Sequence, residues 1–219
     1  SDTRKSCGID IKSWNYNQTA IVCTVQHSRS HEYIAHERFL PSGPFAILPL
    51  HGEPKEAANR SSIVWTEREA IVPSLISLEE KDFVIELARR FGTFLGDIKI
   101  ISPLYTYPLN LQFAQRNTDR RLVLIGDASQ SMHPIAGQGL NMGLRDVAAL
   151  AEVLVDAYRL GMDIGDDVVL RRYSKWRRFD NTLMIAATDA LNRLFSNNIV
   201  PLRLARDIGL GIVDSIPPL

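Results

Sequence analysis

Cysteine is scarce in this chain, with only Cys7 and Cys23 among 219 residues. Their spacing matches no zinc-ligand pattern and two cysteines cannot build a disulfide framework, so we expect a reducing, cytoplasmic environment. No run of about 18 uninterrupted apolar residues is present, which predicts that no helix spans a membrane. The five histidines are scattered without metal-ligand spacing, so no metal site is expected.

An excess of charge of either sign is also absent, because Lys plus Arg and Asp plus Glu each number 25. A protein that binds nucleic acid through bulk electrostatics needs a basic excess, so no nucleic-acid partner is expected. Hydrophobic residues at 45% and charged residues at 23% are ordinary globular values, which exclude a disordered chain. The length is enough for one large domain or two small ones, with a core that needs no disulfides.

The first half of the chain is rich in short β-branched and apolar runs. These runs are residues 19–26, 33–39, 45–50, 62–66, 98–104 and 107–113. Their close spacing predicts an antiparallel sheet of four or more strands, with the second run pairing with the first. A helix is expected after Ser77, as a capping box in which Glu80 stands three residues after the cap.

The second half begins with a strand–loop–helix pattern. Residues 122–125 form a continuous apolar run, typical of a buried strand in a parallel sheet, and end at Gly126-Asp127. A Gly-rich loop then leads into helices expected over 140–160, with Ala149, Leu150, Leu154 and Val155 inward, and over 166–196. An acid at the end of a strand and glycines at a helix start indicate a site for an anion or electron-rich group. Many α/β folds have this pattern without any ligand, and that alternative stays open at this point.

Residues 133–147 read His-Pro-Ile-Ala-Gly-Gln-Gly-Leu-Asn-Met-Gly-Leu-Arg-Asp-Val. This segment resembles the second flavin-binding motif of the para-hydroxybenzoate hydroxylase superfamily, in the form found in its ubiquinone-biosynthesis branch. Residues 37–50, 62–65 and 107–109 and parts of the tail are similar to the same branch, most closely its octaprenyl-methoxyphenol hydroxylases. One departure is Ser129-Gln130, where many members have Ala-His.

The resemblance implies an FAD-dependent monooxygenase that uses NAD(P)H and O2 to hydroxylate a prenylated phenol. The implied FAD-binding residues are Gly126, Asp127, Pro134, Ala136, Gly137, Gln138, Gly139, Leu140 and Asn141. Asp127 is expected to bind the ribityl chain, and the backbone of 137–141 to face the pyrimidine edge of the flavin. The implied substrate residues are Phe45, Ile47 and Leu48 as apolar walls, and His133, for which capping a turn is an equal alternative. No catalytic side chain is assigned, because the flavin does the difficult chemistry.

The expected fold class is α+β: a β-sheet substrate domain, the C-terminal part of an FAD-binding α/β domain and a helical tail. The expected domains are 1–10 (the end of an FAD and NAD(P)H motif), 11–105 (substrate), 106–160 (FAD) and 161–219 (C-terminal helices). A Gly-x-Gly-x-x-Gly motif, which grips the FAD pyrophosphate in the family, is absent. We therefore expect part of a larger enzyme, which alone does not hold FAD tightly.

Two other functions remain open: another flavin oxidoreductase of the same fold, and a non-catalytic substrate- or lipid-binding fragment. The apolar stretch 191–216 is expected either to pack on another domain or to lie on a bilayer, giving peripheral contact with the inner membrane. An assembly with other ubiquinone-biosynthesis enzymes is a further expectation. The basic group Arg171, Arg172, Lys175, Arg177 and Arg178 fits anionic lipid, or a solvated helix face with Tyr173, Trp176 and Phe179 inward, which is favoured.

Overall fold

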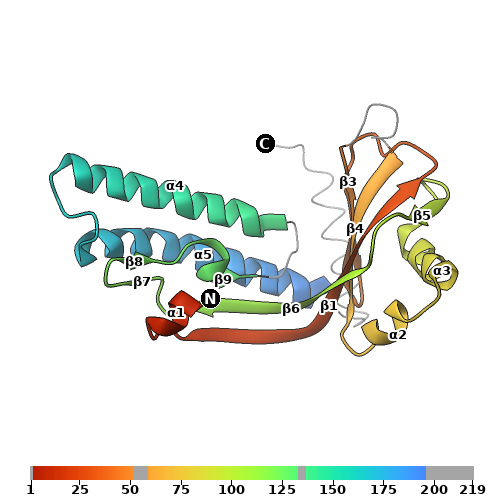
Figure 1. The fold of residues 1–219 in the computed structure, drawn as a ribbon, viewed down its shortest axis with the longest axis horizontal. Coiled ribbons are helices and arrows are strands. Elements are labelled where there is room, and N and C mark those ends of the chain that lie inside the picture. Colours follow the sequence, from red (N-terminus) through yellow and green to blue (C-terminus); the bar gives the residue numbers. More distant parts are fainter. Residues whose placement is uncertain (1, 52–58, 133–136, 196–219) are drawn as a thin grey trace. The chain divides into compact units, whose positions relative to one another are not determined.

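A computed structural model describes residues 2–51, 59–132 and 137–195 of the chain (Figure 1). The strands are β1 (Ile11–His27), β2 (His36–Leu40), β3 (Gly43–Pro49), β4 (Arg60–Arg68), β5 (Ile98–Ile100), β6 (Tyr105–Ala114), β7 (Thr118–Asp119), β8 (Leu122–Val123) and β9 (Gln130–Ser131). The helices are α1 (Asp2–Ser6), α2 (Val72–Ile76), α3 (Glu80–Phe91), α4 (Gln138–Arg159) and α5 (Asp167–Phe195), with the short 3-10 helix η2 (Gly126–Ala128). None of the described helices is long and apolar enough to cross a bilayer.

The chain divides into two compact units. Unit 1 comprises residues 1–16 and 110–191, and unit 2 comprises residues 17–109 and 192–219. The chain passes from one unit to the other within β1, within β6 and within α5. Strands therefore dominate unit 2, whereas α4 and most of α5 belong to unit 1.

The main sheet has seven strands in the order β2-β3-β4-β1-β6-β9, with β5 paired to β1. The pairs β1–β4, β2–β3 and β3–β4 are antiparallel, which confirms the kind of sheet that the sequence predicts. The expected pairing of residues 33–39 with 19–26 is wrong, because β2 pairs with β3 and β1 with β4. A short turn joins Leu40 to Gly43, and so tight a turn folds β2 back on its sequence neighbour.

Unit 2 has an apolar core between one face of the sheet and helices α2 and α3. Its buried members are Ile21, Cys23, Val25, Phe45, Ile47, Ile63, Trp65, Val72, Leu75, Phe83, Leu87, Phe91 and Leu95. Strand alternation supplies the sheet residues, and helical spacing puts Phe83, Leu87 and Phe91 on one side of α3. The indole of Trp65 contacts the Phe83 ring at 5.6 Å between centroids, and the Arg90 guanidinium lies 4.3 Å from the Trp65 ring.

The expected capping box at Ser77 is wrong. Helix α3 has Glu79 as its N-cap, while Ser77 is the C-cap of the separate helix α2 and its hydroxyl donates to the Ser74 carbonyl at 2.9 Å. Pro73 in the first turn of α2 is the sequence signal for this extra helix, because proline is tolerated at a helix start.

Unit 1 confirms both long helices, α4 and α5, at nearly the expected bounds. They meet through Ala149, Val153, Ala157, Val169 and Tyr173, which are buried. Some of the expected orientations are wrong. The side chains of Val155, Trp176 and Phe179 are exposed, and Arg177 in the basic group is buried.

The apolar run 122–125 does not form a strand of a parallel sheet within the described residues. Only Leu122–Val123 is a strand, and it pairs antiparallel with β7. Leu124 is buried but Ile125 is exposed, so the run is not enclosed on all sides. The apolar stretch 191–216 lies outside the described residues after Phe195.

Candidate functional site

The turn after β8 presents a carboxylate to solvent. Gly126 has φ +54°, a left-handed conformation that glycine adopts without steric cost, and it starts η2. The Ser129 N–H closes the turn by donating to the Gly126 carbonyl at 2.9 Å. Asp127 is exposed, and no described residue gives its side chain a hydrogen bond or an ion pair. This carboxylate is available to accept hydrogen bonds from a ligand.

The start of α4 presents backbone donors. Its N-cap is Gly137, at φ +60° and ψ +26°, and no side chain of the described residues caps the helix. The backbone amides of the first turn of α4 point toward the helix start, where the positive end of the helix dipole lies. A Cβ placed on Gly137 or Gly139 would meet no described atom within 4 Å, so there is open space above this turn.

A close backbone approach brings the turn and the helix together. A Cβ on Gly143 would lie 3.6 Å from the Gly126 Cα, within ordinary van der Waals contact, so η2 packs on α4 at this point. Gly143 is four residues after Gly139, about one helical turn from the open helix start. The turn that holds Asp127 thus packs on α4 about one helical turn after the start of that helix.

A buried ion pair lies beneath the turn. The Asp146 carboxylate on α4 accepts the Gly126 N–H at 3.0 Å through Oδ2 and the Arg177 Nε–H at 2.7 Å through Oδ1. The Arg177 side chain is 2% exposed and the Asp146 side chain 0% exposed. Burial raises the pKa of the adjacent Tyr173 hydroxyl well above its usual range, and the Asp146 carboxylate adds to this shift while Arg177 opposes it.

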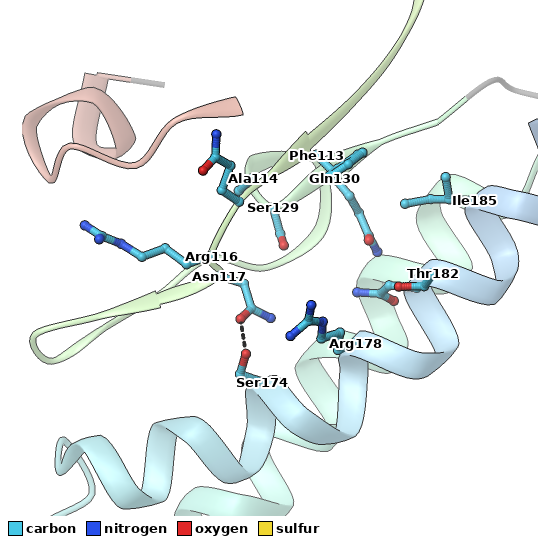
Figure 2. A pocket seen from close by; sticks show the side chains of 12 residues that line it. Phe113, Ala114, Arg116, Asn117, Ser129, Gln130, Ser174, Arg178, Thr182 and Ile185 are labelled. Atoms are coloured by element: carbon cyan, nitrogen blue, oxygen red, sulfur yellow. Dashed lines mark hydrogen bonds between the residues drawn. The ribbon is translucent and has the colours of Figure 1, made fainter. Parts of the chain in front are cut away.

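Unit 1 also contains a pocket of about 440 Å³ that residues of β6, β9 and α5 line (Figure 2). Gln130 lines it with a buried amide nitrogen that has no hydrogen-bond partner among the described residues. The Ser174 hydroxyl donates to Asn117 Oδ1 at 2.5 Å across the same pocket. Asn181, which accepts a hydrogen bond from Arg177, also lines it, so the pocket adjoins the ion pair.

Of the expected flavin site, Gly126 and Asp127 lie in η2 and residues 137–141 lie at the start of α4, the helix on which η2 packs, while Pro134 and Ala136 lie outside the described residues. Phe45 and Ile47 are buried in the core that faces α2 and α3, so a ligand would reach them only if that core opened. Leu48 is exposed on the opposite face of β3. His133 lies outside the described residues. No described group of three or more His, Cys, Asp and Glu is arranged to hold a metal ion.

The importance of Arg177 cannot be seen in the sequence, although Asp146 stands inside the flavin-like segment. Arg177 is one of five cations within eight residues, and spacing alone predicts a solvated face for all of them. Its position on α5 four residues after the buried Tyr173 is the one available signal, because residues four apart share a helix face.

Solved structures of other proteins share this fold. The probable FAD-dependent monooxygenase PqsL of Pseudomonas aeruginosa matches with a TM-score of 0.70 and 20% identity, over 89% of this chain and 53% of that one. The p-nitrophenol 4-monooxygenase PnpA of Pseudomonas putida matches with a TM-score of 0.69 and 20% identity, over 96% of this chain and 51% of that one. At these identities, the matches show a shared fold.

Relatives found by sequence share a higher identity with this chain and show its family. Ubiquinone hydroxylase UbiL of Rhodospirillum rubrum is 55% identical over all of this chain and 50% of its own length. The 3-demethoxyubiquinol 3-hydroxylase of Escherichia coli is 35% identical, over 96% of this chain and 52% of its own length. The family model described as FAD binding domain matches residues 1–185. The chain belongs to the FAD binding domain family, which confirms the resemblance seen in residues 133–147, and it spans about half the length of these relatives.

The described residues fit FAD. Open space over Gly137 and Gly139 leaves room for a flat ring system at the helix start, and the exposed Asp127 carboxylate suits a polyhydroxyl chain. The packing of Gly126 on Gly143 sets the spacing between η2 and α4.

Proposed function

We propose that this chain supplies part of the flavin site and the substrate wall of an FAD-dependent hydroxylase. The proposed substrate is a prenylated phenol of ubiquinone biosynthesis, with NAD(P)H and O2 as co-substrates. The observation that carries the proposal is the packing of η2, which holds Asp127, against α4 through Gly126 and Gly143. The names of the relatives from Rhodospirillum rubrum and Escherichia coli support the choice of substrate.

In this site, each group of the chain has a distinct role. The Asp127 carboxylate accepts hydrogen bonds from ribityl hydroxyls, while the amides of 138–140 donate to the electron-rich pyrimidine edge of the flavin. The positive end of the α4 dipole stabilises negative charge at that edge. When bound, FAD supplies the redox chemistry that activates oxygen, and the chain supplies orientation and electrostatics.

The substrate wall belongs to unit 2 in this proposal. Leu48 is exposed on the sheet face opposite α2 and α3, and Ala46 and Val64 are half-buried on the same face. This face offers apolar contact to a phenol ring or a prenyl chain. Phe45 and Ile47 would act from the other side, by keeping β3 in place through their core contacts.

A prenylated substrate resides in a bilayer, so the proposal includes peripheral contact with the inner membrane and with other enzymes of the pathway. The exposed Trp176 and Phe179 on α5, beside the exposed cations Arg171, Lys175 and Arg178, support this contact, because aromatic and basic side chains favour anionic bilayer surfaces. Flotation with anionic vesicles checks it. A protein that stays at the bottom of the gradient contradicts the membrane contact.

The hydroxylase proposal is tested by fusing the chain to the half of the Rhodospirillum rubrum relative that this chain does not match. We expect the fusion to bind FAD and to consume NAD(P)H and O2 in the presence of a prenylated phenol. The product should gain one oxygen atom, which isotope-labelled O2 traces by mass spectrometry. A fusion that binds FAD and consumes NAD(P)H without forming hydroxylated product would favour another flavin oxidoreductase.

Asp127→Ala supplies the site-specific arm of this test. Loss of a charge-assisted hydrogen bond costs about 1.5–3 kcal/mol, so FAD should bind roughly ten- to hundredfold more weakly. Asp82→Ala, at an exposed aspartate of α3 in unit 2, is the matched control and should leave the affinity unchanged. Equal FAD affinities for the two variants would contradict the proposed role of Asp127.

A further inference from the structure

The amide nitrogen of Gly126 is held by a side chain that no flavin contact explains. Gly126 directly precedes Asp127, and its N–H donates to Asp146 Oδ2 at 3.0 Å. Because Gly126 is in a left-handed conformation and packs on Gly143, its N–H points into α4. The Asp146 carboxylate therefore fixes the backbone that aims the Asp127 side chain.

Asp146 is in turn held by Arg177 of α5. The guanidinium uses all three nitrogens: Nε donates to Asp146, Nη1 to Asp180 Oδ2 at 2.6 Å, and Nη2 to Asn181 Oδ1 at 3.0 Å. The carboxylate of Asp146 has both oxygens occupied by donors of known direction. The contacts thus run from α5 through α4 to the residue before Asp127, and the two side chains that make them are buried.

A contribution to folding stability does not explain why Asp146 and Arg177 are charged. Burying two charges costs several kcal/mol per ion, and apolar side chains of similar volume stabilise a core equally well or better. What an apolar pair lacks is direction, because hydrogen bonds fix both distance and angle. An arrangement in which Arg177 orients Asp146 and Asp146 orients Gly126 fits a positioning role.

A second ion pair joins the same two helices and serves as a reference. Arg172 of α5 donates to Asp156 of α4 at 3.2 Å, and their side chains are 60% and 38% exposed. This pair has the same chemistry and connects the same elements. It contacts no residue of the turn at 126–129 in the described structure.

We propose that Asp146 and Arg177 are positioning residues that hold the Gly126–Asp127 turn in the geometry that binds FAD. The inference rests on the proposed flavin site, and it adds the device that shapes this site from behind. Neither side chain touches the cofactor. Both act through the Gly126 amide.

The test uses the purified, isotope-labelled chain and reads the turn directly by NMR. In Asp146→Asn, one amide oxygen must serve two donors, because the new NH2 group faces either Arg177 or Gly126 donor to donor. We expect hydrogen exchange of the Gly126 amide to accelerate at least about tenfold, and FAD to bind at least about tenfold more weakly in titrations of the amide shifts. Asp156→Asn should change neither quantity by more than about twofold.

Arg177→Lys is the second variant, which keeps the charge but loses the fork of donors. We expect a smaller acceleration of exchange in the same turn, with the rest of α4 and α5 unchanged. If Asp146→Asn does not fold, Arg177→Lys decides: normal exchange at Gly126 and normal FAD affinity overturn the proposal. A folded Asp146→Asn with the parent's exchange rate overturns it as well.

The exchange measurement also separates this proposal from the proposed function. It is made without FAD, so it reports whether the pair holds the turn even if the parent chain shows no amide shift changes with FAD. Absence of FAD binding by both the parent chain and the fusion would contradict the flavin site, and with it the purpose assigned to the pair. Fast exchange in Asp146→Asn together with unchanged FAD affinity would show a merely structural link, and would likewise overturn the proposal.

Discussion

The core of unit 2 and the core of unit 1 are built from different kinds of side chain. In unit 2, aromatic and aliphatic side chains such as Trp65, Phe83 and Phe91 fill the space between sheet and helices. In unit 1, the deepest side chains between α4 and α5 include the charged Asp146 and Arg177. Apolar burial stabilises without direction, whereas hydrogen-bonded charges fix positions at an energetic cost. The comparison teaches that stability is concentrated in unit 2 and geometric precision in unit 1.

The two principal helices of these units express the same difference. Helix α3 turns its large apolar residues into the core of unit 2 and exposes only Ile85 among them. Helix α4 buries Met142 and Val153 together with the small residues Ala149 and Ala157, but it leaves more of its larger apolar side chains exposed. These exposed side chains are Leu140, Leu144, Val147, Val155 and Tyr158. Unit 1 therefore gains less from apolar burial and depends more on its polar contacts.

The largest effect that we predict is the loss of an aromatic side chain from the core of unit 2. Phe83→Ala should lower the free energy of unfolding by about 3–5 kcal/mol, because it removes buried apolar surface and leaves a cavity beside Trp65. Urea unfolding measures this loss, with indole fluorescence as the signal.

Ile85→Ala, on the exposed side of the same helix, is the matched control and should cost less than about 1 kcal/mol. Equal losses for Phe83→Ala and Ile85→Ala would show that α3 does not seal the core of unit 2, and would remove one side of the comparison.

A slightly smaller loss of stability is expected when the buried ion pair of unit 1 is broken. Removing both charges should cost less than removing one. Arg177→Met leaves the Asp146 carboxylate buried and unpaired, which should lower the free energy of unfolding by about 3–4 kcal/mol. The double variant Asp146→Leu/Arg177→Met removes both charges and should be less destabilised than Arg177→Met, although it must lose order at Gly126. Thermal unfolding of the two variants checks this ranking. A double variant that is the less stable one would mean that the ion pair contributes net stability.

The sequence predicts the elements of this fold better than their contacts. Helices α4 and α5 and the antiparallel sheet follow from local periodicity and β-branched runs, which act within a few residues. The pairing of β1 with β4 joins residues up to 50 positions apart, and the two-helix arrangement around Ser77 depends on competition between neighbouring caps. Local patterns do not encode these choices, so both expectations are wrong.

For the site, glycine positions and one motif are sufficient to find the turn and the helix start. They do not reveal that Gly126 lies against Gly143 or that Arg177 reaches Asp146 from a helix 31 residues further along the chain. A buried arginine within a run of cations has the same local pattern as its exposed neighbours. Only the tertiary structure distinguishes them.

Unit 2 contains one polar group that should make its stability depend on pH. The buried His27 donates from Nδ1 to the Arg29 carbonyl at 2.6 Å, so its neutral form accepts the Ser61 hydroxyl at Nε2, 3.0 Å away. Burial lowers the pKa of His27 below its usual 6.5, more than the Arg29 contact raises it, and nearby His31 lowers it further.

As the pH falls below about 6.5, the unfolded chain takes up a proton at His27 before the native protein does. The free energy of unfolding should therefore be constant with respect to His27 above this pH, and should fall below it by at most about 1.4 kcal/mol per pH unit. His27→Gln should flatten this part of the profile, as measured by urea unfolding between pH 5 and 8, roughly the range in which histidine titrates. An unchanged profile would mean that His27 is protonated equally in both states.

The smallest predicted effect is a gain in the free energy of unfolding, at the contact between the turn and α4. Gly143 is inside a helix, where glycine costs about 0.5–1 kcal/mol relative to alanine. A Cβ at this position would meet the Gly126 Cα at 3.6 Å, an ordinary van der Waals contact. Gly143→Ala should therefore raise the free energy of unfolding by about 0.5 kcal/mol, while any displacement of Gly126 would appear in its amide shift. Gly126→Ala is the opposite case, because φ +54° strains any residue with a Cβ, and it should destabilise by about 1 kcal/mol. If Gly143→Ala is stabilised but its Gly126 amide moves, the turn yields to one methyl group, and the precision attributed to unit 1 depends on glycine at that contact as much as on the ion pair beneath it.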